Sequence, residues 1–308
     1  MATADAIASS SLTVNIPLHL AMPLSEFEAD YYDQVHAGQL HMRESRVAFV
    51  GLARNCAGPL TNNLAKIEQL SRRFESWALH IEENDSDDTT VQVLTDFAAR
   101  HPQATFTSQR LDREQFSAEF AGKRTIALAE YRAACQQWVR ECCPDSDYVV
   151  VIDFDAWGGW IDEGLANAFG WMSHMPDAYG MASVSLFQHQ FRDGAHWAHY
   201  DLWALRGVGQ PGCYWDTYQN GCGGWGYWWF PAVGSEPVVV ASAFGGMVIY
   251  RTSAYLAGSY DGTKDCEHVA FHQSVSRQTG MRLYVCPSMR TVMHWLPEVA
   301  NGGQHGDD

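Results

Sequence analysis

The chain has 308 residues, with 20 Lys and Arg against 36 Asp and Glu, which gives a formal net charge of −16 at pH 7. Hydrophobic residues make up 46% of it and charged residues 18%, a composition typical of a globular protein with a sizeable core and not of a disordered one. The acidic balance and the lack of a basic stripe exclude nucleic acid as an expected partner, and the lack of a long apolar run predicts no transmembrane segment.

The first half of the chain alternates short apolar runs with segments of helical periodicity. Residues 1–45 show no clear period and are interpreted as an N-terminal extension. This alternation is typical of an α/β fold with a mostly parallel central sheet flanked by helices. The predicted strands are 47–52, 77–81, 105–106 and 148–152, and the predicted helices are 60–74, 91–97 and 124–140.

Ligands of such sheets bind at the carboxyl ends of the strands. This rule places residues 53–55, 82–88 and 153–155 on one rim, and it predicts a Rossmann-like nucleotide-binding half at 46–156. Residues 157–300 are then expected to form the acceptor-binding half of the same domain, and 301–308 a flexible tail. Because neither GxGxxG nor GxxxxGK[ST] follows the first strand, a dinucleotide-binding dehydrogenase and a P-loop enzyme are not supported.

The second half is rich in glycine and tryptophan. A strand is predicted at 202–205, another at 244–250, and a helix at 265–279 that Gly280 ends. Trp225 and Trp228 lie in a glycine-rich stretch and are predicted to form a lid, because aromatic faces stack on sugar rings and glycines let a loop close. The alternative is a hairpin whose tryptophans only pack in the core.

Two carboxylates follow the clearest strand. Asp153 and Asp155 are two residues apart, so in extended chain both face the same side. Two anions held this close repel each other, and a hard divalent cation, Mn²⁺ or Mg²⁺, resolves the repulsion and leaves positions open for a diphosphate. The alternative is that one Asp caps the next turn while the other is solvated.

The segment Val149 to Asp155, VVVIDFD, resembles the DxD segment of GT-A fold glycosyltransferases. The resemblance implies a GT-A-like sheet, a metal held by Asp153 and Asp155, and a nucleotide diphosphate sugar donor, GDP- or UDP-linked. It also implies His294 as a third metal or diphosphate contact. The residues that it places around the nucleotide are Ala53, Arg54, Asn55, Glu82, Asn84, Asp85, Arg124, Arg132 and Phe154.

A second resemblance covers Tyr200 to Arg206, YDLWALR, which is similar to a segment of fungal capsule-associated α-1,3-mannosyltransferases, although Gly207 replaces the second Asp of that pattern. It implies mannose as the hexose that is moved. The acceptor side is then expected to hold Gly245, Gly246 and His268, and the catalytic carboxylates are Asp201 and Glu267. Each of these two carboxylates also has a structural alternative, Asp201 as a strand-edge partner of Arg206 and Glu267 as a favourable charge at a helix start.

The sequence therefore predicts a metal-dependent glycosyltransferase that moves a hexose to a hydroxyl of a glycan or glycolipid. Two alternatives stay open: a nucleotidyltransferase that forms sugar nucleotides, and a carbohydrate-binding protein built from alternating strands. A form that keeps the fold without turnover is a third.

The eight cysteines and the N-terminus bear on the compartment. No CxxC pair occurs among the cysteines, and scattered thiols without a secretory leader fit a reducing cytoplasm, where an acceptor at the inner membrane surface is within reach of a peripheral enzyme. Whether Cys213 and Cys222 pair is left open.

Overall fold

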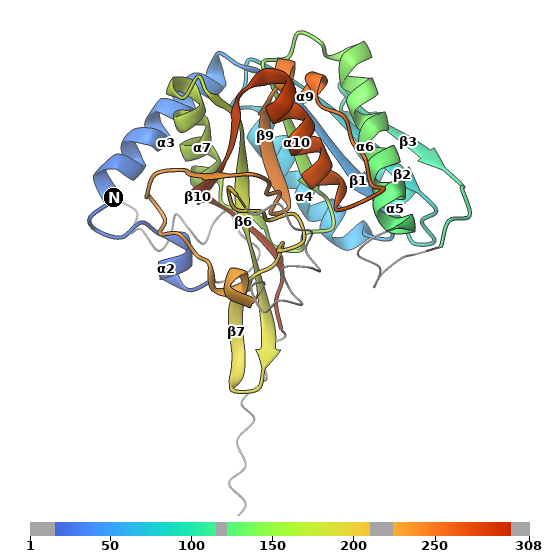
Figure 1. Ribbon diagram of the computed structural model, residues 1–308. Coiled ribbons are helices and arrows are strands. Elements are labelled where there is room, and N and C mark those ends of the chain that lie inside the picture. The colour runs from blue at the N-terminus through green and yellow to red at the C-terminus, as the bar shows by residue number, and fades with distance from the viewer. Residues whose placement is uncertain (1–15, 115–121, 210–223, 297–308) are drawn as a thin grey trace, which may run out of the picture.

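The computed structural model describes residues 16–114, 122–209 and 224–296, which build a ten-stranded sheet with helices on both faces (Figure 1). The strands are β1 (Arg46–Ala53), β2 (Ser76–Asn84), β3 (Ala104–Gln109), β4 (Tyr148–Asp153), β5 (Gly159–Trp160), β6 (Ala178–Phe191), β7 (Gly194–His199), β8 (Val238–Val240), β9 (Met247–Arg251) and β10 (Arg282–His294). The helices are α2 (Leu18–Ala21), α3 (Glu28–Arg43), α4 (Ala57–Ser71), α5 (Thr90–Arg100), α6 (Lys123–Cys142), α7 (Asp162–His174), α9 (Thr252–Ala257) and α10 (Glu267–Thr279), with the 3₁₀ helix η1 (Gly224–Trp228).

The sheet runs in the order β3-β2-β1-β4-β9-β6-β10-β5, with β7 paired to β6 and β8 paired to β10. Parallel pairing joins β1 to β2 and β4, β2 to β3, and β6 to β10. The predicted α/β class, a central sheet flanked by helices, is confirmed. The second half is more mixed than predicted, because β9 lies between β4 and β6 and runs antiparallel to both.

Alternation along the central strands produces two cores. On β1, Val47 and Phe49 face one core, and Ala48 and Val50 face the other, as the two-residue period of a strand requires. The first core is covered by α3, α4, α5 and α7, and the second by α6, α9 and α10. A strand buried on both faces reads as a continuous apolar run, which is why β1 and β4 were recognisable in the sequence.

The N-terminal region contains a helix that the sequence analysis missed. α3 packs along α7, and at their crossing Gly38 lies so close to α7 that a Cβ atom there would sit 1.7 Å from the carbonyl oxygen of Ala166. Gly170 makes the reciprocal approach to the backbone of Gln34. The buried residues of α3, Tyr31, Val35, Gly38 and Met42, do recur at helical spacing, although residues 1–45 were interpreted as an extension without a period.

Two further expectations are corrected. Residues 202–205 are not a strand but an irregular segment that follows β7, and Arg206 forms an isolated bridge to Ser242. The carbohydrate-binding alternative predicted strands throughout, which the long helices α3, α4 and α6 contradict. None of the helices in the described part of the chain combines the length and apolar character needed to cross a membrane.

Candidate active site

A cavity of about 540 Å³ opens where the carboxyl ends of β1, β2 and β4 meet α6 and the start of α10. Ala53, Asn84 and Asp153, which end these three strands, all line it, as the rule for parallel strands predicts. Of the sequence-predicted site residues, those that line the cavity are Ala53, Arg54, Asn84, Arg124, Arg132, Asp153, Asp155, Asp201, Gly246, Glu267 and His268.

Asp153 and Asp155 both face this cavity. Asp153 is the last residue of β4, and its backbone N–H donates to the carbonyl of Gly246 at 2.9 Å. Burial raises the pKa of Asp153 to about 7; Asp155 and Asp201 add to the rise, while Arg132 opposes it. Asp155 is open to the cavity, yet the surrounding protein removes water from its carboxyl and raises its pKa. Burial therefore disfavours the charged form of both carboxyl groups.

Arg132 is the cation that contacts Asp153. Its Nε donates to Oε1 of Glu267 at 2.9 Å, and its Nη2 donates to Oδ1 of Asp153 at 3.3 Å. The guanidinium also lies over the ring of Phe244, 4.8 Å from the centroid. Burial opposes its charge, but Glu267 and Asp153 outweigh burial and raise the pKa of Arg132 above its ordinary value. A buried ion-pair network therefore connects α6, α10 and β4.

The glycine pair Gly245–Gly246 positions two carboxylates. Both residues have positive φ, 65° and 80°, a conformation that glycine adopts without strain. The N–H of Gly245 donates to Oδ2 of Asp201 at 2.9 Å, and the carbonyl of Gly246 holds Asp153. Burial raises the pKa of Asp201. Gly246 lines the cavity, whereas Gly245, predicted on the acceptor side, supports Asp201 from behind.

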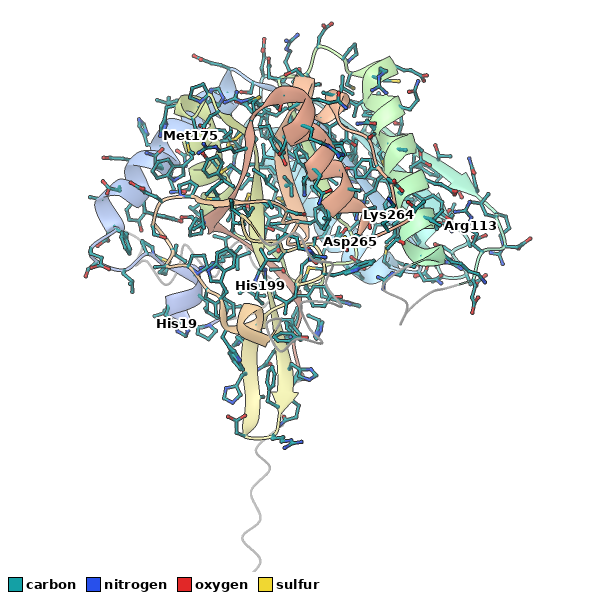
Figure 2. All side chains as sticks on the ribbon, viewed as in Figure 1. His19, Arg113, Met175, His199, Lys264 and Asp265 are labelled. Carbon is teal, nitrogen blue, oxygen red and sulfur yellow. The ribbon has the colours of Figure 1, made fainter. Side chains whose placement is uncertain are left out.

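The segment that carries Asp201 is tied to the start of α10. Nη2 of Arg206 donates to both carboxyl oxygens of Asp265, at 2.9 and 3.1 Å, and Asp265 lies just below the first turn of α10 (Figure 2). The same turn brings Glu267 and His268 to the cavity. Both ring nitrogens of His268 are buried without a hydrogen-bond partner, and burial, with Arg132 and His272, lowers the pKa of His268 well below its usual value. Its ring is therefore neutral at pH 7.

The residues that follow β1 and β2 mainly form hydrogen bonds with neighbouring loops and contribute little to the cavity wall. Arg54 lines the cavity, but its Nη2 donates to the carbonyl of Arg113 at 2.7 Å. Asn55 accepts a hydrogen bond from the N–H of Asp87 at 2.7 Å and does not line the cavity. Asp85 accepts hydrogen bonds from the N–H groups of residues 111–113 at 2.7, 2.8 and 3.2 Å. Asn55 and Asp85 therefore act as structural anchors, a correction to the prediction that they contact the nucleotide.

Replacing Asp85 by asparagine is expected to cost about 2 kcal/mol of stability at pH 7, because the loop loses hydrogen bonds to a charged acceptor. Burial by itself would raise the pKa of Asp85, but the hydrogen bonds from Asn84 and the backbone outweigh it and lower the pKa to about 2. The contribution is therefore complete above the unfolded pKa of about 3.9 and is lost as the pH falls toward 2. Urea unfolding of the wild type and the variant between pH 7 and pH 2.5 measures this stability contribution as a function of pH.

The difference between the wild type and the Asp85→Asn variant should shrink over that pH range. Asp87→Asn, whose side chain is 73% exposed, serves as the matched control and should leave the pH profile unchanged. A difference that stays constant down to pH 2.5 would contradict the anchoring role.

Two other predicted nucleotide contacts are corrected. Glu82 lies within β2, and its carboxylate pairs with Nε2 of His80 at 2.9 Å, away from the cavity. Phe154 is completely buried in the first core, where it packs against Gly51, so its side chain cannot touch a ligand. Successive side chains of an extended segment point in opposite directions. Because Phe154 points into the core, its neighbours Asp153 and Asp155 point outward toward the cavity.

His294 does not complete a metal site. Its ring packs against Phe187 and Tyr200, with centroids 5.3 and 6.0 Å apart, and it does not line the cavity. Among the residues that the structure describes, no three His, Cys, Asp or Glu side chains converge as metal ligands. The aspartate pair alone fits the donor chemistry of a hard divalent cation, since it offers carboxylate oxygens and leaves the other positions to water or phosphate.

The predicted aromatic lid is only partly within the described residues. Cys213, Cys222 and the side chain of Trp225 lie outside them. Trp228 is 54% exposed and packs on Phe191, 5.1 Å between centroids, and not over the cavity. Its neighbour Tyr227 lines the cavity instead.

The sequence analysis missed several lining residues. Arg113 and Glu114 reach the cavity through the loop that Asp85 holds, and Tyr131 lies on α6, with the guanidinium of Arg113 over its ring at 5.2 Å. Figure 2 shows Arg113 next to α6. Residues 110–114 carry no motif, so only the three-dimensional fold brings them here. For Tyr131, its position one residue before Arg132 on α6 was the available signal.

No protein-family model matches the chain, and no curated protein matches it. Among solved structures, it is similar to the mannosyltransferase PcManGT from Pyrobaculum calidifontis in complex with GDP-Man and Mn²⁺ (14% identity, TM-score 0.48, 90% of this chain and 67% of that one). It is also similar to GalNAc-T7 with UDP, GalNAc and Mn²⁺ (12%, 0.49, 93% and 56%) and to S. aureus TarS 1-349 (10%, 0.46, 80% and 60%). The chain thus spans less than two thirds of the latter two, and similarity this low assigns no role to any residue.

Proposed function

We propose that this protein is a metal-dependent glycosyltransferase, which moves a hexose from a GDP- or UDP-linked sugar to a hydroxyl of a glycan or glycolipid. One observation carries the proposal. Asp153 and Asp155 project from the end of β4 into a cavity of about 540 Å³, and burial with neighbouring carboxylates raises the pKa of Asp153 to about 7. Carboxylates in that state are poised to take up a cation. The likeness of VVVIDFD to the DxD segment agrees with this, and the likeness of residues 200–206 makes mannose the first sugar to test.

Asp153 and Asp155 are the residues that hold the metal in this proposal. A bound Mn²⁺ or Mg²⁺ supplies positive charge that neutralises a diphosphate leaving group. Arg132 and Arg124 add fixed positive charge to the same cavity wall, with Arg124 lying 5.1 Å from the ring centroid of Trp203. Ala53, Arg54 and Asn84, at the ends of β1 and β2, border the end of the cavity where the nucleoside is expected.

Asp201 is the proposed general base. It lines the cavity, its orientation is set by N–H donors of Gly245 and Ala204, and burial raises its pKa, which makes the carboxylate a stronger base. Glu267 is 1% exposed and is bound to Arg132, so its role in the proposal is to position that guanidinium. His268, whose lowered pKa keeps its ring neutral, lines the cavity beside Glu267 and is the proposed contact on the acceptor side.

Calorimetric titration with UDP, GDP and CMP, and with their sugar derivatives, tests the proposal when each is measured with Mn²⁺ and with EDTA. The expected result is binding of one nucleotide class that requires the metal, followed by metal-dependent release of that nucleoside diphosphate from its sugar conjugate when acceptor glycans are supplied. If no nucleotide binds in either condition, the proposal is wrong.

A further inference from the structure

The β6–β7 hairpin projects beyond the body of the molecule (Figure 1). Phe187 of β6 lines the cavity, so the hairpin starts beside it. On β6, Phe187, His189 and Phe191 are two residues apart and share one face. On β7, His196 stands directly opposite His189. Tyr227 and Trp228 of η1 cover the same face. We call this set the aromatic strip: Phe187, His189, Phe191, His196, Tyr227 and Trp228.

The rings of the aromatic strip form a continuous series. From the cavity outward, Tyr227 and Phe187 are 6.4 Å apart between centroids, Phe187 and His189 5.7 Å, and His189 and Phe191 5.0 Å. Phe191 and Trp228 are 5.1 Å apart. Because Phe187 and Tyr227 also line the cavity, the aromatic strip begins inside the candidate active site and ends on the exposed Trp228.

We propose that the acceptor of this enzyme is an oligosaccharide of several linked sugars, whose chain lies along the aromatic strip and whose end enters the cavity. This rests on the proposed function and deepens it. The strip is roughly 13 Å long from Phe187 to Phe191, at about 3.3 Å per residue, which a chain of linked rings covers and a single monosaccharide does not.

The side chains of the strip favour carbohydrate. Aromatic faces stack on the apolar faces of sugar rings, and the two imidazoles offer donors and acceptors to hydroxyl groups. None of the six carries a carboxylate, guanidinium or ammonium group, so a charged ligand is not selected. Opposite Phe187 and Phe191, β7 has the small residues Ala198 and Gly194. Phe191 is partly exposed, whereas Phe187 is 8% exposed and is reached only where it borders the cavity.

A lipid surface fits the hairpin less well. Its tip consists of the exposed polar residues Gln190, Arg192 and Asp193, which do not insert into hydrocarbon. Among the described residues the most exposed aromatic side chain is that of Trp228, which comes from η1 and packs on Phe191, and not from the turn at residues 192–193. A chain lying lengthwise therefore matches the geometry, and a membrane contact made by the tip does not.

The test uses the full chain on a printed array of neutral linear oligosaccharides of glucose, galactose, mannose and xylose, from monosaccharides to hexasaccharides. Vesicles of phosphatidylcholine and phosphatidylglycerol serve as the second probe. The wild type is expected to bind one oligosaccharide series with an affinity that rises with chain length. Trp228→Ala and Phe191→Ala should each weaken it by about tenfold, as expected for the loss of one stacking ring.

Tyr32→Ala is the matched control, since Tyr32 is 41% exposed on α3 and far from the hairpin in sequence and fold. It should leave oligosaccharide binding unchanged. The inference is overturned if the wild type binds no oligosaccharide, or if its affinity does not rise with chain length. It is also overturned if both strip variants bind oligosaccharides as the wild type does, or if they lose vesicle binding and not oligosaccharide binding.

Nucleotide binding with Mn²⁺, measured on the same variants, separates this inference from the proposed function. It should be unchanged, because Trp228 and Phe191 do not line the cavity. If nucleotides bind but oligosaccharides do not, the aromatic strip has been misassigned and the glycosyltransferase proposal stands. If oligosaccharides bind through the strip while nucleotides do not, the proposed function is wrong and the strip is a carbohydrate site on its own.

Discussion

Asp155→Asn is expected to weaken binding of a nucleoside diphosphate in the presence of Mn²⁺ by about 100-fold or more, since a bound divalent ion contributes several kcal/mol through charge alone. The thermal stability of the metal-free protein should be unchanged or higher. Burial raises the pKa of Asp155, which means that its charged form is unfavourable in the folded protein, and the asparagine relieves that cost. Loss of binding together with retained stability is the signature of a ligand-holding carboxylate.

Calorimetric titration with and without EDTA measures this prediction. In EDTA the wild type and the variant should bind the nucleotide equally weakly, because the difference between them is carried by the metal. Asp147→Asn is the matched control: Asp147 lies just before the opposite end of β4 and pairs with Arg46 on the surface. Equal, metal-dependent binding by Asp155→Asn and the wild type would contradict the assignment of the aspartate pair.

Features that depend on one strand and its end could be predicted from the sequence. β4 is a run of β-branched and aromatic residues buried on both faces, so its position and its end at Asp153 follow from the pattern. The rule that parallel strands present their carboxyl ends on one rim then places Ala53, Asn84 and Asp153 at a single cavity. This much of the site needs no knowledge of side-chain packing.

Features that depend on side-chain partners far along the chain could not be predicted. Asp85 faces its loop because three N–H groups, 26 to 28 residues later, are left without partners there. Phe154 turns inward because Gly51, on the neighbouring strand, leaves room for its ring. No local pattern encodes either pairing, and the same holds for the contact between Arg132 and Glu267, which are 135 residues apart.

Arg132→Met is expected to lower the free energy of unfolding by about 3–5 kcal/mol, the cost of breaking a buried ion pair from one side. The reason is that Glu267, 1% exposed, and Asp153 lose the guanidinium that both contact. Urea unfolding in EDTA measures the change. Arg46→Met removes an exposed pair, with side chains 45% and 42% accessible, and should change the unfolding midpoint little.

A double-mutant cycle shows whether the two partners act as one unit. Glu267→Gln alone should also be destabilising, because it leaves Arg132 with a weaker partner in a buried place. The double variant Arg132→Met with Glu267→Gln should be less destabilised than the sum of the single changes, by roughly 0.5–3 kcal/mol. Strict additivity would mean that the contact contributes nothing specific, and that each residue acts only through its own packing.

Mn²⁺ connects this network to the proposed metal site. Removing Arg132 leaves Asp153 and Asp155 without the cation that partly offsets their repulsion, so a divalent ion at the pair should stabilise Arg132→Met more than it stabilises the wild type. The measurement is the shift in melting temperature on adding Mn²⁺ to each protein. Equal shifts in the two proteins would mean that Arg132 and the metal do not share Asp153, and the site would then have to be sought elsewhere in the cavity.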